Sequence, residues 1–112
     1  MLRREDLALS IADAVTAVPG VAGLTGGPGV EVATLFAGGK VVGLRLGDDQ
    51  VDVHIVADRA PLTAVADEAA AAVRRVLAAA GDRRGVQVVV DDVVAEAVDR
   101  RSSSRSRSRS RE

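Results

Sequence analysis

His54 is the only histidine of the chain, and Asp52 stands two positions before it. Residues two apart in an extended strand share a face, so these two side chains form the one pair suited to proton transfer or metal binding. Arg45 and Asp91 are candidate cross-strand neighbours of the pair. The chain has no cysteine and no second histidine, which are the ligands that most transition-metal sites use. We therefore interpret His54 as a solvated or lightly paired side chain on the outer face of a sheet and expect no metal site.

The sequence also offers no clear site for nucleophilic catalysis. Ser10 is the only serine before residue 102 and falls within a predicted helix. A serine nucleophile needs an adjacent base that a third group holds in place, and no such triad can be assembled before the C-terminal tail. We expect no catalytic residues and a protein that is not an enzyme.

Two glycine-rich stretches could suggest phosphate binding, namely GGPG at residues 26–29 and GGK at residues 38–40. Phosphate-binding glycine loops lead directly into a helix, and the P-loop continues with Ser or Thr after its lysine. Extended, strand-like sequence follows both stretches here. We interpret them as turns and expect no nucleotide or other cofactor.

The chain divides by charge into two parts. Residues 1–99 carry nine basic and fifteen acidic side chains, whereas residues 100–112 carry six arginines and one glutamate. The second part has no apolar residue, so we expect an α+β domain at 1–99 and a disordered Arg/Ser tail at 100–112. The residues that could hold nucleic acid or an anionic membrane are Arg100, Arg101, Arg105, Arg107, Arg109 and Arg111. A merely solubilising role of the tail stays open.

Apolar periodicity predicts the elements of the domain. Residues 7–18 and 62–80 repeat apolar side chains at helical spacing, and Pro19-Gly20 and Gly81 end these two helices. Extended runs at 30–36, 40–46 and 51–57 lie between the helices, and a short strand at 21–24 is left open. Residues 86–90 form a last strand that is apolar on nearly both sides, which is typical of a central or covered position.

The order α-β-β-β-α-β predicts an α+β fold, a two-layer α/β sandwich in which both helices cover one face of a mainly antiparallel sheet of four to five strands. The opposite face would mix charged and aliphatic side chains, and such a face is seldom left uncovered. We expect it to be an interaction surface. Its predicted residues are Leu35, Val41, Arg45, Asp52, His54, Val56, Val89 and Asp91.

Several stretches resemble the alkaline-shock and Gls-type general-stress proteins of Gram-positive bacteria. They are IA at 11–12, VPGVAGL at 18–24, LG at 46–47, VDVHIV at 51–56, PLTAVA at 61–66 and VQVVVDDV at 86–93. The resemblance spans about residues 7–95. The chain departs from the commoner pattern at Ala57-Asp58-Arg59, where an aromatic residue and a glycine are usual, and in its Arg/Ser tail.

The resemblance implies a non-enzymatic, envelope-stress adaptor or scaffold that self-associates or binds protein partners. It also implies a protein that a partner of related sequence brings to the membrane. The N-terminus lacks the continuous apolar stretch of a signal peptide, and no run approaches the length of a bilayer span. We expect a cytoplasmic, oligomeric bacterial protein. The alternative is a nucleic-acid-associated protein that binds through the basic tail.

Overall fold

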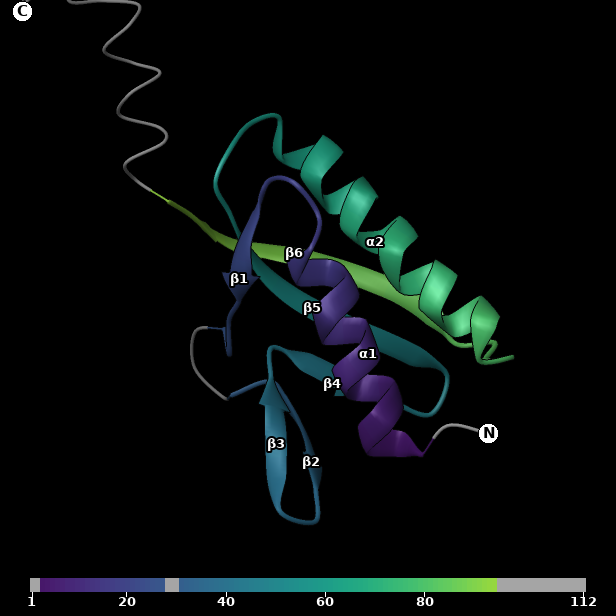
Figure 1. Cartoon of the computed structure of the whole chain (residues 1–112). Coiled ribbons are helices and arrows are strands. Elements are labelled where there is room, and N and C mark those ends of the chain that lie inside the picture. Colours follow the sequence, from purple (N-terminus) through teal and green to yellow (C-terminus); the bar gives the residue numbers. More distant parts are fainter. Residues whose placement is uncertain (1–2, 28–30, 95–112) are drawn as a thin grey trace, which may run out of the picture.

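The computed structural model describes residues 3–27 and 31–94 (Figure 1). It confirms the α+β fold, with two helices and a mainly antiparallel set of strands. The elements in chain order are α1 (Arg4–Thr16), β1 (Val21–Leu24), β2 (Ala33–Phe36), β3 (Gly39–Val42), β4 (Leu44–Leu46), β5 (Gln50–Ala57), α2 (Leu62–Ala79) and β6 (Gly85–Val93). The short strand after the first helix, left open by the sequence, is β1.

Strand β5 is the centre of a four-stranded sheet. On one side it pairs with β6 in parallel, through the crossover that contains α2. On its other side two short strands lie end to end, since β1 pairs antiparallel with the last residues of β5 and β4 pairs antiparallel with the first. The alternation of β5 places Val51, Val53 and Ile55 on the buried face, as the period-two pattern predicts.

Gly43 makes the junction between β1 and β4. Its φ is +90°, and a Cβ built there would lie 2.9 Å from both the backbone nitrogen and the backbone oxygen of Thr25. His54 completes the junction, because its N–H donates to the Gly43 carbonyl at 2.8 Å and its carbonyl accepts from the Thr25 N–H at 3.0 Å. The predicted strand 40–46 is therefore two strands, with a break that only glycine fits.

Strands β2 and β3 form a separate two-stranded hairpin, and Thr34 fastens it to the main sheet. Thr34 is only 1% exposed. Its hydroxyl donates to the Leu44 carbonyl at 2.6 Å and accepts from the Leu46 N–H at 3.2 Å. The hydroxyl thus satisfies backbone groups on the side of β4 that pairs with no strand among the described residues.

Both helices lie side by side on the same face of the sheet (Figure 1). α1 packs on β1 and β4, whereas α2 packs on β6. The core between them consists mainly of Val, Leu, Ile and Ala, and its largest fully buried side chains are Ile11, Leu44 and Ile55. Phe36, the one aromatic residue, packs against the edge of this core.

The sequence predicts a central or a covered position for the last strand, and the structure shows the covered one, because α2 packs on β6. β6 pairs only with β5 among the residues that the structure describes, so it lies at an edge of the sheet and not at its centre. Its apolar sequence nevertheless has the character of an inner strand. The amino-acid composition of β6 is therefore typical of a central strand, although the strand lies at an edge of the sheet.

Candidate interaction surface

The face of the four-stranded sheet opposite the helices is called the open face below. Of the eight residues predicted for an interaction surface, six lie on β4, β5 or β6, the strands that form this face. They are Arg45, Asp52, His54, Val56, Val89 and Asp91. Arg45 is exposed, and the other five are partly buried.

His54 and Asp91 form the centre of the open face. The Nδ1 atom of His54 lies 2.8 Å from Oδ2 of Asp91, and their side chains are 19% and 11% exposed. A carboxylate only accepts hydrogen bonds, so the tautomer with its proton on Nδ1 is the one that can donate to Asp91. Asp91 reaches this position because β6 has a register shift against β5 between Val90 and Asp92, which leaves Asp91 as the extra residue of a bulge.

Gly27, in the connection between β1 and β2, lies over this pair. A Cβ at Gly27 would be 3.3 Å from Oδ2 of Asp91 and 3.5 Å from Nδ1 of His54. The pair is thus partly covered by the chain's own backbone, which explains its low exposure. The candidate partner Asp91 was predicted from strand parity, but the covering segment was not, because nothing in a glycine-rich turn indicates which surface it will lie against.

Polar side chains extend from this centre toward the start of β5. Arg45 and Asp52 are register partners on β4 and β5. Nε2 of Gln50 donates to Oδ1 of Asp52 at 2.6 Å and to Oε1 of Gln87 at 2.9 Å, which links β5 to β6. The sequence prediction omits Gln50 because it begins this strand at residue 51.

Aliphatic side chains stand beside these polar groups. Val56 and Val89 are both partly buried, and Val89 is the register partner of His54. No helix packs on this side of the sheet among residues 3–27 and 31–94. The open face therefore combines a paired polar centre with uncovered aliphatic groups.

Two residues predicted for this face lie elsewhere. Val41 is 8% exposed and belongs to the core cluster, so its predicted place on the open face is wrong. Leu35 is 69% exposed but lies on β2, in the separate hairpin. The prediction extended the alternation of Arg45 backward along one continuous strand, and the break at Gly43 interrupts that alternation.

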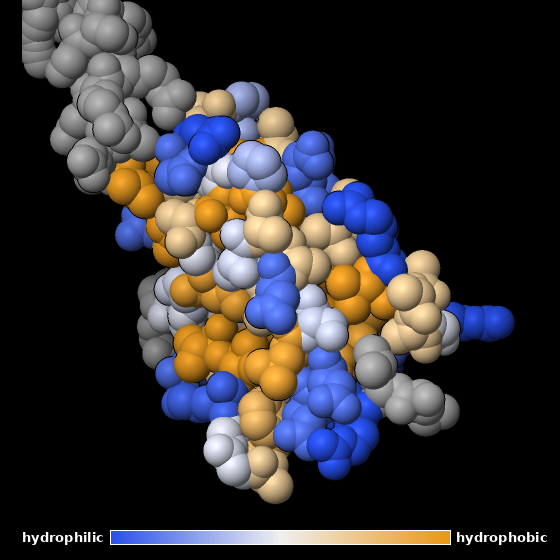
Figure 2. Space-filling view, in the orientation of Figure 1, coloured by the Kyte–Doolittle hydropathy of each residue, from blue (hydrophilic) through white to orange (hydrophobic). Residues whose placement is uncertain are grey.

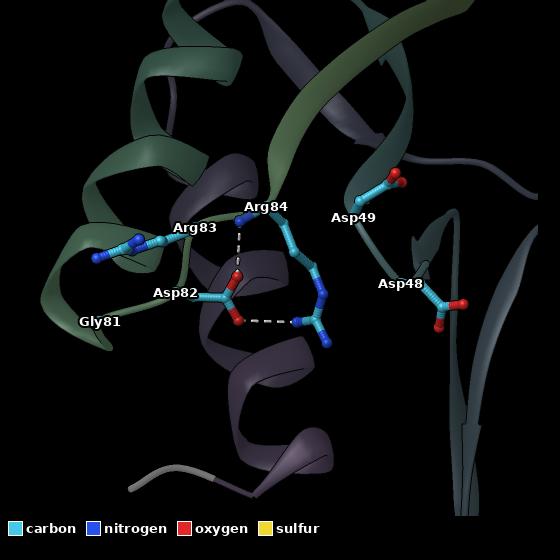
Figure 3. Close-up of a pocket in the computed structure, with 6 residues that line it drawn as sticks. All are labelled: Asp48, Asp49, Gly81, Asp82, Arg83 and Arg84. Carbon is cyan, nitrogen blue, oxygen red and sulfur yellow. Dashed lines mark hydrogen bonds and ion pairs between the residues drawn. The ribbon is translucent and has the colours of Figure 1, made fainter.

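A polar hollow of about 400 Å³ lies at the end of the sheet, between the β4–β5 turn and the connection from α2 to β6. Figure 3 shows Arg84 between Asp82 and the Asp48–Asp49 turn, with Arg83 directed away from Asp82. Asp82 accepts from the Arg84 N–H at 2.9 Å and from Nη1 of Arg84 at 2.8 Å. This pairing shapes the turn that starts β6, so we interpret the hollow as structural.

The side of the molecule that carries the helices is different in character. Figure 2 shows hydrophobic groups gathered where α1 meets the β2–β3 hairpin, with hydrophilic groups around them. Leu9 on α1 and Leu35 on β2 are among the exposed large hydrophobic residues. These groups continue the core outward and bring no reactive side chains together.

Among the described residues, no cluster of three or more His, Cys, Asp or Glu side chains could hold a metal ion. Ser10 is the one serine in this part of the chain and lies in α1. Neither α1 nor α2 has the length and apolar character that crossing a membrane requires.

No known protein family, curated protein or solved structure matches this chain. The six arginines predicted to bind polyanions lie in residues 100–112, outside the described residues.

Proposed function

We propose that this protein is a non-catalytic adaptor or scaffold that acts by self-association or by binding protein partners through the open face of its sheet. One observation carries the proposal. Both helices pack on one face, and the other face presents aliphatic side chains beside a satisfied polar centre.

The arrangement of the open face favours protein contact over chemistry. The acidic and amide groups at its centre are already paired with one another, as in the His54–Asp91 and Gln50–Asp52 contacts. A partner could bind there without breaking these contacts, and Arg45 and Asp52 lie opposite each other across β4 and β5. Val56 and Val89 would supply apolar area, so the surface has the mixture typical of non-obligate interfaces.

The resemblance to alkaline-shock and Gls-type proteins supports a more specific role. We propose that the protein serves the envelope stress response in the bacterial cytoplasm. A membrane-anchored partner of related sequence would bring it to the envelope. Self-association and partner binding are both compatible with one exposed sheet surface.

Replacement of Val56 and Val89 by glutamate tests the proposal in the full-length chain. The double variant places two charges on the open face and is expected to abolish the binding of protein partners seen by crosslinking in cells. The matched control is Ala78→Glu with Ala79→Glu, since both alanines are exposed on α2. A strictly monomeric wild type whose crosslinked partners are unchanged in the Val56/Val89 variant would overturn the proposal.

A second candidate function rests on the charge asymmetry between the acidic domain and the Arg-rich tail. In this proposal the tail binds RNA or DNA through phosphate contacts. With six arginines engaged, the logarithm of affinity for single strands should fall with the logarithm of salt at a slope of about −4. Removal of residues 100–112 should abolish this binding and leave self-association intact. Unchanged binding after truncation would contradict the proposal.

A further inference from the structure

Strand β6 is long and apolar for an edge strand. It runs for nine residues, and its regular part before the bulge contains Val86, Val88, Val89 and Val90. Isolated edge strands are usually protected by proline, by lysine or by a bulge near the middle. Residues 85–90 contain no proline and no charged residue, and the bulge comes only at Asp91.

The hydrogen bonds of β6 fix which backbone groups face outward. The Gly85 N–H donates to the Asp49 carbonyl at 3.0 Å, so Gly85 faces β5. Backbone groups alternate along a strand, and Gln87 and Val89 therefore also face β5. The N–H and C=O groups of the intervening residues point away from the sheet. Those residues are Val86, Val88 and Val90.

We propose that this outward edge of β6 pairs antiparallel with the same edge of a second copy of the chain, around a two-fold axis at Val88. The inference rests on the self-association in the proposed function, names a second copy as the partner, and places that contact at the edge of the sheet while the open face stays free for other partners. In this register Val88 faces Val88 of the second copy, and Val86 faces Val90 at both ends. All three outward residues then pair in full, which gives about six intermolecular backbone hydrogen bonds.

The charges at the two ends of β6 favour the same register. Arg83 and Arg84 precede the strand, and Asp91 and Asp92 end it. Antiparallel pairing centred on Val88 brings the basic end of each copy to the acidic end of the other. Arg83 and Asp92 are exposed, so they are the charges best placed to meet across the axis. A parallel arrangement would place like charges together.

The symmetry also accounts for the open face. A two-fold axis perpendicular to the sheet keeps the helices of both copies on one side. The two four-stranded sheets become one continuous sheet of eight strands, and the two open faces become one surface. β6 then occupies a central position, one of the two positions that its composition predicts.

The substitution Val88→Pro in the full-length chain tests whether the outward edge of β6 pairs with a second copy. The Val88 N–H faces outward, so proline removes no hydrogen bond to β5 and is tolerated at such a position. Each dimer would lose two hydrogen bonds at the axis, and its dissociation constant should rise about 30-fold in sedimentation equilibrium. Val88→Thr keeps the N–H and the branched shape, and it should dimerise like the wild type.

Charge reversal gives a second test that does not alter the backbone. Arg83→Glu and Asp92→Arg should each weaken the dimer about tenfold, and the double variant should recover most of the wild-type affinity. The inference is overturned if Val88→Pro dimerises normally, if the double reversal fails to rescue the singles, or if the wild type is monomeric. Should the Val56/Val89 variant still lose its partners in those cases, the proposed function stands and only the β6 contact is wrong.

Discussion

At the residue scale, two residues hold together parts of the chain that are distant in sequence. His54 contacts Gly43 through its backbone N–H, Thr25 through its backbone carbonyl, and Asp91 through its ring. Thr34 joins the β2–β3 hairpin to β4 through one buried hydroxyl. Neither role requires catalysis, and both explain why a polar side chain is kept inside or against a largely aliphatic structure.

Thr34→Val tests the hydroxyl. Valine has nearly the same shape but leaves the Leu44 carbonyl and the Leu46 N–H without this partner, so the free energy of unfolding should fall by about 1–3 kcal/mol. Urea denaturation measures the loss. Thr34→Ser keeps the hydroxyl and should cost less than Thr34→Val. Equal stability of the valine variant and the wild type would show that the hydroxyl does not fasten the hairpin.

At the element scale, the break at Gly43 decides the shape of the sheet. Gly43 combines a positive φ with a close approach to the Thr25 backbone, whereas Gly38 has the same φ of +90° and nothing within 4 Å of its built Cβ. Gly23, in β1, has nothing within 4 Å and no positive φ. Gly23 thus has neither feature, Gly38 has only the positive φ, and Gly43 has both. Substitutions at the three positions can therefore distinguish the cost of backbone strain from the cost of steric overlap.

Alanine at these positions should give a graded loss of stability. Gly23→Ala is expected to change the free energy of unfolding by less than about 0.5 kcal/mol. Gly38→Ala should cost about 1 kcal/mol from φ alone, and Gly43→Ala should cost clearly more because the Thr25 backbone cannot give way. Thermal or urea unfolding measures the series. A Gly43 variant no less stable than the Gly38 variant would contradict the role assigned to the junction.

The sequence was a good guide to elements and a weaker guide to their neighbours. Helical periodicity located both helices, and period-two alternation oriented β5 correctly. The positions of Val41 and β6 could not be predicted in the same way. The position of Val41 depends on the break at Gly43, which stops the alternation, and the position of β6 depends on pairing between strands far apart in the sequence. Local sequence patterns indicate whether a side chain is buried. They do not indicate which strand, from the same chain or from another copy, lies beside it.

At the scale of the whole molecule, the proposed pairing of two copies explains why an apolar strand lies at an edge of the sheet. Within one chain, β6 has β5 on one side and, among the described residues, no strand on the other. In the proposed pair of copies, both sides are hydrogen-bonded and the open faces join. The acidic domain and the basic tail would then be duplicated as well, which would double the charge available to a polyanion.

Amide hydrogen exchange on β6, followed as the protein concentration is raised, tests this account most directly. The amides of Gln87 and Val89 bond to β5 and should be protected at every concentration. The amides of Val86, Val88 and Val90 face outward, so they should exchange quickly in dilute protein and become protected as copies pair. Exchange of those three amides that stays fast and independent of concentration would contradict the account.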